Sequence, residues 1–303
     1  MRYCDYYIVI IPYFLNLFEK EKYFLLSVLL VKVEGRPRTL LTMLLRETKN
    51  YKLYHLKIAE VPALLLRPAA PPPYPAILFL HYYRGSKDNL RLLANEIGKA
   101  GFLALAIDME YHGERAQKGK DIFSTDLHDD RLAFERTVQD SLNVLAYLEN
   151  HPQVQEGRIF LWGVSLGSII GTLVAGKYQR FKGVFLVVGG GNLPVLLQDS
   201  MLDSLVEVRY HLAEQGVTAQ KALQGWERLD PLYYVRSASW CTPLFMYNAS
   251  KDDIVPSLCA LELFESANAF KEIRWFPTGH GLLFERSFGV PQVVLGRMKE
   301  LLL

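Results

Sequence analysis

Short apolar runs alternate with longer amphipathic stretches from about Tyr51 onward. Runs that are apolar throughout are typical of strands buried on both faces of a parallel sheet, and the stretches between them have helical periodicity. The predicted strands are Val61 to Leu66, Ala76 to His81, Leu103 to Asp108, Arg158 to Gly163, Gly183 to Val188, Pro243 to Asn248 and Glu272 to Phe276. The predicted helices are Asp88 to Lys99, Thr137 to Asn150, Ser165 to Tyr178, Ser257 to Asn268 and Pro291 to Leu302. The alternation predicts an α/β fold with a mostly parallel sheet and helices on both faces.

Two segments interrupt this alternation. The segment from Gly113 to Arg131 is polar and rich in His and Asp, which is typical of a long loop. The segment from Asn192 to Tyr234 is a helical excursion between two predicted strands. An insertion at this place lies over the carboxyl ends of the strands, where open α/β sheets bind their ligands. We therefore predict a helical lid over about residues 192–234, and the alternative is a surface helical pair without a part in substrate selection.

Residues 1–50 do not follow the alternation, so we predict an N-terminal extension to an α/β domain over residues 51–303. Tyr6 to Ile11 and Phe24 to Val33 are candidates for the strands of a β-hairpin on the edge of the sheet. Met43 stands close to the start of the α/β pattern. The residues before it are therefore either this extension or a stretch upstream of the true start.

The location of the protein is predicted from its N-terminus and its cysteines. The stretch from Tyr6 to Phe18 is strongly apolar, but Pro12 and Asn16 interrupt it. It is shorter than the roughly 20 residues that a membrane-spanning helix needs, and no small-residue cleavage site follows it. Three cysteines without CxxC spacing favour a reducing compartment over a disulfide framework or a zinc site. We predict a cytoplasmic protein, with membrane contact through the N-terminus as the minor alternative.

Composition narrows the class of protein. Apolar residues make up 50% of the chain and charged residues 22%, which is typical of a globular domain and not of a disordered chain. The formal net charge is only +2 and no basic stripe is visible, so nucleic acid is not an expected partner. Composition therefore does not indicate a function, and the candidate catalytic residues have to be found from individual motifs.

The pentapeptide Gly163-Val164-Ser165-Leu166-Gly167 stands between an apolar run and a helix rich in small residues. This G-x-S-x-G motif is typical of a nucleophile elbow, in which a tight strand-to-helix turn exposes the serine hydroxyl. The free N–H groups at the start of the following helix then face the reacting oxygen. Ser165 is the predicted nucleophile, and the alternative is a glycine-rich turn in which Ser165 only caps the helix.

A carboxylate and a histidine follow later strands. Asp252 and His280 each come just past the end of a predicted strand. A serine hydroxyl is a weak nucleophile, so it needs a histidine to take its proton, and the histidine needs a carboxylate to hold its tautomer. We predict a triad of Ser165, His280 and Asp252, with Asp253 as the competing carboxylate. This chemistry requires neither a metal nor an organic cofactor, and none is expected.

These landmarks resemble the α/β-hydrolase superfamily, closest to its dienelactone-hydrolase-like and prolyl-oligopeptidase-related esterase branches. The resemblance extends from about Tyr51 to the C-terminus and implies an α/β-hydrolase fold with a helical lid insertion. The segments that carry it are Ala76 to Asp88, Asp108 to Arg115, the elbow, Asp252 to Pro256, and His280.

The resemblance also implies an oxyanion hole. In these relatives the strand before the first long helix ends in His-Gly-x, and the N–H of x joins the N–H after the nucleophile. Carried over, the two donors are the N–H groups of Tyr83 and Leu166. This chain has Tyr82 where the relatives usually have glycine, so the N–H of Tyr82 is the alternative donor. Dienelactone hydrolases use cysteine at the elbow, whereas this chain has Ser165.

The function that the resemblance implies is hydrolysis of a small-molecule carboxylic ester through an acyl-enzyme intermediate. Acetyl xylan esterases of the related branch typically carry Gln-Gly-Gly after the serine, where this chain has Leu166-Gly167, so deacetylation of a sugar is not indicated. One alternative is a non-catalytic protein of the same fold that binds a ligand or a partner. Another is a membrane-surface lipase anchored by the apolar N-terminus.

Overall fold

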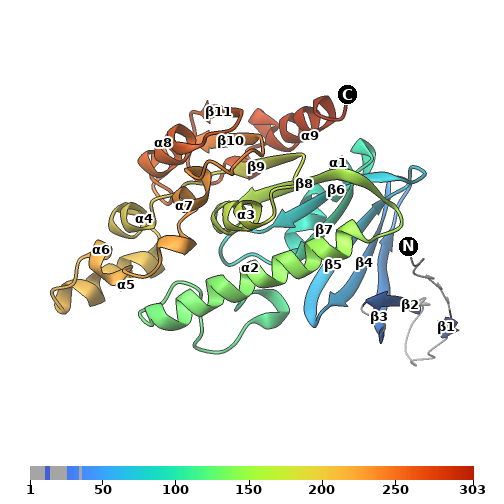
Figure 1. Ribbon diagram of the computed structural model, residues 1–303, viewed down its shortest axis with the longest axis horizontal. Coiled ribbons are helices and arrows are strands. Elements are labelled where there is room, and N and C mark those ends of the chain that lie inside the picture. Colours follow the sequence, from blue (N-terminus) through green and yellow to red (C-terminus); the bar gives the residue numbers. More distant parts are fainter. Residues whose placement is uncertain (1–10, 14–25, 34–35) are drawn as a thin grey trace.

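The computed structural model describes residues 11–13, 26–33 and 36–303, and the strands of these residues form one sheet flanked by helices (Figure 1). The strands are β1 (Ile11–Tyr13), β2 (Leu26–Val33), β3 (Arg36–Glu47), β4 (Tyr51–Ile58), β5 (Val61–Pro68), β6 (Tyr74–Leu80), β7 (Leu103–Ile107), β8 (Val154–Val164), β9 (Gly183–Val187), β10 (Leu244–Ala249) and β11 (Lys271–Phe276). The α-helices are α1 (Leu90–Ala100), α2 (Leu127–Glu149), α3 (Leu166–Lys177), α4 (Leu193–Asp199), α5 (Asp203–Glu214), α6 (Ala219–Ala222), α7 (Pro231–Val235), α8 (Ser257–Ser266) and α9 (Val290–Glu300).

The sheet has two parts that differ in strand direction. Its order is β1-β2-β3-β4-β5-β7-β6-β8-β9-β10-β11. Strands β6 to β11 run parallel to one another. Strands β1 to β5 form an antiparallel edge, which joins the parallel part where β5 pairs with β7. The prediction of an α/β-hydrolase fold with a mostly parallel sheet and helices is confirmed.

The parallel strands present alternate residues to two separate cores. In β6, Ala76, Leu78 and Leu80 pack in one core, while Ile77 and Phe79 pack in the other. Helices α2, α3 and α8 contribute to the first core and helices α1 and α9 to the second (Figure 1). Because these strands are buried on both faces, their sequences are apolar throughout, and the hydrophobic pattern finds them.

The hydrophobic pattern did not predict strand β4, which pairs with β5 in a hairpin. The two residues between the strands, Ala59 and Glu60, both have positive φ. Two-residue turns of this kind usually contain Asn or Gly. This turn contains neither, so the usual turn signal is missing. The feature of the sequence that indicates β4 is the alternation of apolar and polar residues along Tyr51–Ile58. The burial of these residues also varies along the strand.

The predicted loop from Gly113 to Arg131 is wrong at its C-terminal end, because α2 already begins at Leu127. The carboxylate of Asp126 caps the helix by accepting a hydrogen bond from the N–H of Asp129, at 3.1 Å. Asp129 and Asp130 lie in the first turn of the helix, where carboxylates interact favourably with the helix dipole. The acidic residues that resemble a loop in the sequence are therefore the start of a helix.

The N-terminal strands extend the antiparallel edge of the sheet. Strand β2 pairs with β1 on one side and with β3 on the other, and β3 was not predicted. The predicted strand from Tyr6 to Ile11 lies outside the described residues except for Ile11, which belongs to β1.

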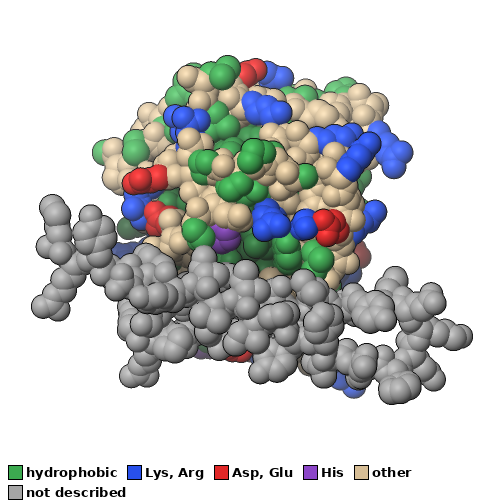
Figure 2. Space-filling model, turned by 90° about the vertical axis from the view of Figure 1, so that its right-hand side faces the viewer, with side chains coloured by type: hydrophobic (Ala, Val, Ile, Leu, Met, Phe, Trp, Pro, Cys, Tyr) green, Lys and Arg blue, Asp and Glu red, His purple; other side chains and the backbone are tan. Residues whose placement is uncertain are grey.

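Figure 2 views the right-hand end of Figure 1, where several Lys and Arg side chains lie among hydrophobic and uncharged ones. Within the described ranges, no helix is long and apolar enough to cross a membrane.

Helices α4 to α7 form an excursion between β9 and β10, which we call the α4–α7 insertion. One carboxylate joins its two ends. Asp230 accepts a hydrogen bond from the N–H of Asn192 at 3.0 Å and another from the N–H of Leu193 at 2.6 Å. It also caps α7 by accepting from the N–H of Leu232 at 2.9 Å. The segment from Asn192 to Asp230 therefore begins and ends at nearly the same point, and α7 then leads the chain back toward the start of β10, which runs parallel to β9.

Candidate active site

The pentapeptide forms a sharp turn between β8 and α3. Ser165 has φ 53° and ψ −117°, a backbone conformation that is strained for a residue with a side chain. A Cβ atom at Gly163 would collide with the carbonyl oxygen of Gly167, and a Cβ atom at Gly167 would collide with the carbonyl oxygen of Leu80. Both glycines are therefore required by the close approach of backbone segments around the turn. The turn holds the Ser165 side chain at the carboxyl end of β8.

Three predicted residues meet at this turn. The Nε2 atom of His280 lies 2.8 Å from the Oγ atom of Ser165. The Nδ1 atom of the same imidazole lies 2.9 and 2.8 Å from the two carboxylate oxygens of Asp252. Strands β8, β10 and β11 are parallel, so the residues that follow their carboxyl ends lie at one edge of the sheet.

The structure distinguishes Asp252 from the competing Asp253. The carboxylate of Asp252 is almost fully buried, with 2% of the side chain exposed, and contacts His280. It also accepts hydrogen bonds from the N–H groups of Ile254 at 3.0 Å and Val255 at 2.9 Å. These two donors hold the carboxylate in the orientation in which it faces the imidazole. Asp253 uses its backbone carbonyl to accept from the N–H of Met201 and does not contact the imidazole.

The two residues predicted to supply the oxyanion donors line the same cavity. Leu166 is the first residue of α3, so its N–H has no acceptor within the helix. Tyr83 lies in a tight turn that is closed by a hydrogen bond of 2.9 Å from the N–H of Gly85 to the carbonyl of Tyr82. Throughout the described part of the chain, the N–H groups of Tyr83 and Leu166 donate no backbone hydrogen bond, and both residues line the cavity beside Ser165.

The side chains of the two tyrosines fix the turn from outside. The hydroxyl of Tyr82 accepts a hydrogen bond from Asn89 at 2.8 Å, and the hydroxyl of Tyr83 donates one to Asp121 at 2.6 Å. The Tyr83 ring also packs against the ring of Phe123. The contact with Asp121 was not predicted, because nothing in the local sequence links two residues so far apart. Aromatic side chains therefore support this turn through contacts with Asn89, Asp121 and Phe123.

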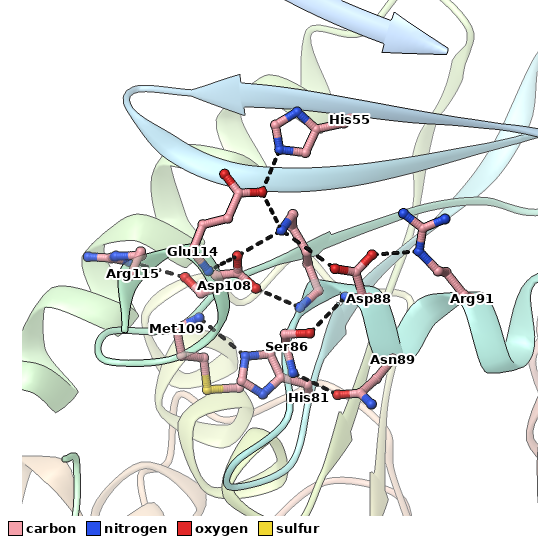
Figure 3. Close-up of polar contacts among 11 residues, drawn as sticks. His55, His81, Ser86, Asp88, Asn89, Arg91, Asp108, Met109, Glu114 and Arg115 are labelled. Carbon is pink, nitrogen blue, oxygen red and sulfur yellow. Dashed lines mark hydrogen bonds and ion pairs between the residues drawn. The ribbon is translucent and has the colours of Figure 1, made fainter. Parts of the chain in front are cut away.

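A buried polar cluster lies behind the turn (Figure 3). The ammonium group of Lys87 lies 2.9 Å from Asp108 and 2.7 Å from Glu114, and the backbone N–H of Lys87 also donates to Asp108 at 2.8 Å. Glu114 in turn contacts the imidazole of His55 on β4 at 2.7 Å. Burial alone would lower the pKa of Lys87, but its hydrogen bonds to Glu114 and Asp108 raise it. This cluster ties the segment after β6 to the segment after β7.

His81 stands next to this cluster and is neutral. Burial lowers its pKa to about 3. Its Nδ1 atom lies 2.8 Å from the carbonyl oxygen of Tyr82, and its Nε2 atom accepts from the N–H of Met109 at 3.3 Å. A carbonyl can only accept, so the proton of the imidazole is on Nδ1. Neither His81 nor His112, whose Nδ1 contacts the carbonyl of Glu110, reaches Ser165 by a hydrogen bond.

The cavity beside Ser165 has a volume of about 170 Å³. Its walls come from the turn after β6, from α3, from the α4–α7 insertion and from the segment after His280. Among the described residues, no Lys, Arg, Asp or Glu side chain lines it. Elsewhere in the described ranges, no group of three or more His, Cys, Asp or Glu side chains is arranged to hold a metal ion. The cavity therefore suits an apolar molecule with one reactive polar centre.

Two curated proteins of Bacillus subtilis (strain 168) are similar to this chain in sequence. "Putative hydrolase YtaP" is 26% identical over 172 residues, which are 52% of this chain and 55% of that protein. "Putative esterase YitV" is 26% identical over 196 residues, which are 60% of this chain and 70% of that protein. The match to the first of them spans only about half of its length.

A solved structure and a family model complete the comparison. Acetyl xylan esterase 1 from Thermoanaerobacterium sp. JW/SL YS485 has a TM-score of 0.67 and 17% identity, over 86% of this chain and 87% of that one. At this identity the similarity shows the fold alone. The model of the Dienelactone hydrolase family matches residues 61–223, which include Tyr83 and Ser165 and end before Asp252. Since this match covers more than half of the chain, the protein belongs to the Dienelactone hydrolase family.

Proposed function

We propose that this protein is a serine esterase that hydrolyses small-molecule carboxylic esters through an acyl-enzyme on Ser165. The family and the relatives support hydrolase activity in general. The observation that carries the serine mechanism is the position of His280, which lies within hydrogen-bond distance of both Ser165 and Asp252. This is the arrangement that a serine hydroxyl needs to become a nucleophile near neutral pH.

The chemistry follows from these contacts. The Nε2 atom of His280 takes the proton of Ser165 while the Oγ atom forms a bond to the carbonyl carbon of the ester. When the tetrahedral intermediate collapses, the same Nε2 gives this proton to the leaving alcohol oxygen. A water molecule then repeats the sequence in the second half-reaction, so that the acid is released and Ser165 regains its proton. Asp252 stabilises the imidazolium that exists in each half.

The N–H groups of Tyr83 and Leu166 are the proposed donors to the oxyanion. Negative charge moves to the carbonyl oxygen only when the tetrahedral intermediate forms, so these donors stabilise the transition state more than the bound ester. Removing one such donor typically lowers kcat by a factor on the order of 100 to 1,000. Between the two tyrosines, the N–H of Tyr83 is favoured because the carbonyl of the same peptide, that of Tyr82, is held by the N–H of Gly85, which fixes the direction of the Tyr83 N–H.

The test compares Ser165→Ala with Ser168→Ala, a buried serine one turn further along α3 whose hydroxyl donates to the carbonyl of Val187. We expect Ser165→Ala to lose hydrolysis of p-nitrophenyl acetate and labelling by a fluorophosphonate probe, because both need the Oγ nucleophile. Ser168→Ala should retain both. Undiminished turnover in Ser165→Ala would contradict the proposal. Failure of the wild-type protein to react with the probe would instead favour the non-catalytic binding protein.

A further inference from the structure

The cavity beside Ser165 borders a second and smaller cavity. Three apolar side chains, Phe123, Leu196 and Leu205, line both of them. The first cavity has a volume of about 170 Å³ and the second about 30 Å³. The second lies between α2 and the α4–α7 insertion, and its other walls include Asp130, Val208 and Trp226. The space next to the reactive serine is therefore adjacent to a second space beneath the insertion, with the side chains of these three residues in the walls of both.

We propose that this second cavity receives the far end of a neutral, unbranched acyl chain, so that the preferred substrates are esters of medium-chain fatty acids. The inference rests on the proposed function, because it assigns a place to the acyl group of the same reaction. It also gives the α4–α7 insertion a part in substrate selection.

The position of His280 orients the ester. Its Nε2 atom must reach the leaving oxygen after it has taken the proton of Ser165, so the alcohol lies on the side of the cavity next to the imidazole. That side is lined by Leu283 and Phe284, which follow His280 in the chain. In this proposal the acyl group extends away from the leaving oxygen and passes Leu205, which lines both cavities.

The charges around the two cavities select a neutral chain. No ionised side chain among the described residues lines the first cavity, and Asp130 is the acidic group in the wall of the second. Asp130 accepts hydrogen bonds from the N–H of Ser124 at 2.7 Å and from its hydroxyl at 2.6 Å, so both carboxyl oxygens have partners. A terminal carboxylate would lose its water and meet Asp130, and a terminal ammonium would lose its water in a wall whose other side chains are apolar. A methyl end avoids both costs.

Helix α5 lines both cavities with one face. Leu205 lines both, and Val208, one turn further along, lines the second alone. Leu212 follows Val208 by another turn, is buried in the same core, and lines neither cavity. The pair Val208 and Leu212 therefore offers a controlled experiment, in which a phenylalanine is placed inside the second cavity or just beyond it.

The first test is a chain-length series of p-nitrophenyl esters from acetate to decanoate. For the wild-type protein we expect kcat/KM to rise about fourfold for each added methylene group until the second cavity is filled, because each group leaves water. Val208→Phe should lower the octanoate-to-acetate ratio by about tenfold or more and leave acetate hydrolysis within about twofold. Leu212→Phe should leave the ratio unchanged. Val208→Ala, which does not crowd the core, should move the optimum to longer chains.

The second test does not need turnover. Trp226 lines the second cavity, and a bromine atom quenches tryptophan fluorescence on contact. In the Ser165→Ala background, methyl ω-bromooctanoate should quench more strongly than methyl 2-bromooctanoate. Replacing Trp226 with Phe should remove this difference while the signal of the other tryptophans remains.

The outcomes separate this inference from the proposed function. A wild-type profile that does not rise with chain length, or one that both Val208 variants leave unchanged, would overturn the acyl assignment even where Ser165 reacts with the fluorophosphonate. Equal quenching by the two bromo esters would overturn it as well. If Ser165 does not react but ω-bromo quenching through Trp226 is observed, the chain site is supported and the esterase proposal fails.

Discussion

Replacement of His81 tests how the oxyanion donor is held. The carbonyl of Tyr82 and the N–H of Tyr83 belong to the same planar trans peptide, so whatever fixes the carbonyl also aims the N–H. Two donors hold this carbonyl, the Nδ1–H of His81 at 2.8 Å and the N–H of Gly85 at 2.9 Å. His81 is therefore a positioning residue for the proposed oxyanion hole, although it does not touch the substrate.

The size of the effect follows from these contacts. A buried hydrogen bond contributes about 0.5–1.5 kcal/mol, so removing the one from His81 shifts the orientation of the peptide by at most about tenfold. We expect His81→Leu to lower kcat by about three- to tenfold with little change in KM, since the donor itself remains. Loss of the other bond, to the N–H of Met109, costs stability instead, by about 1–3 kcal/mol.

Two further variants separate these effects. Asn at position 81 can place an N–H near the site of Nδ1, so His81→Asn should recover kcat. Gln can place an oxygen near the site of Nε2, so His81→Gln should recover stability and not kcat. Because burial lowers the pKa of His81 to about 3, the loss in His81→Leu should be equal at pH 6 and pH 8. An unchanged kcat in His81→Leu would refute the positioning role of His81. Recovery of kcat in His81→Gln but not in His81→Asn would refute it as well.

Three other predictions concern carboxylates and one buried ion pair. Asp252→Asn should lower kcat by about 1,000-fold or more in the ester assay, whereas Asp253→Asn should stay within about threefold. Lys87→Met should lower the free energy of unfolding by about 3–5 kcal/mol in a denaturant titration, because it leaves Asp108 buried without its partner. Burial raises the pKa of Asp130 to about 7. The folded state therefore binds the proton of Asp130 more tightly than the unfolded state does. The protonated carboxyl stabilises the fold fully below pH ~4, and this stabilisation, up to about 4 kcal/mol, is lost as the pH rises to ~7. Asp130→Asn should remove that part of the pH dependence, and an unchanged slope of unfolding free energy against pH would contradict it.

The parallel strands were predictable because their burial on both faces makes them apolar, and residues that follow their ends must share one edge of the sheet. By that logic the sequence predicts that Ser165, Asp252 and His280 lie close together, and the imidazole of His280 is within hydrogen-bond distance of both other side chains. The turn at Ala59 and Glu60 could not be found in the same way, because its residues are not the ones that such turns prefer.

The contacts that support the turn after β6 could not be predicted from the sequence, for a different reason. Lys87 pairs with Asp108 and Tyr83 with Asp121 across loops of irregular length. Such pairs follow from the three-dimensional path of two loops and leave no periodic pattern. The same holds for Phe123, which reaches the two cavities from a segment whose sequence predicted only a loop.

The clamp formed by Asp230 makes the α4–α7 insertion an exchangeable module. Because one side chain joins the two ends of the segment from Asn192 to Asp230, we expect the length and helices of this segment to be changeable without moving β9 relative to β10. A graft between Asn192 and Asp230 would then carry a new binding specificity onto an unaltered scaffold. Extending such an inserted loop adds little entropic cost, since the cost grows only with the logarithm of its length.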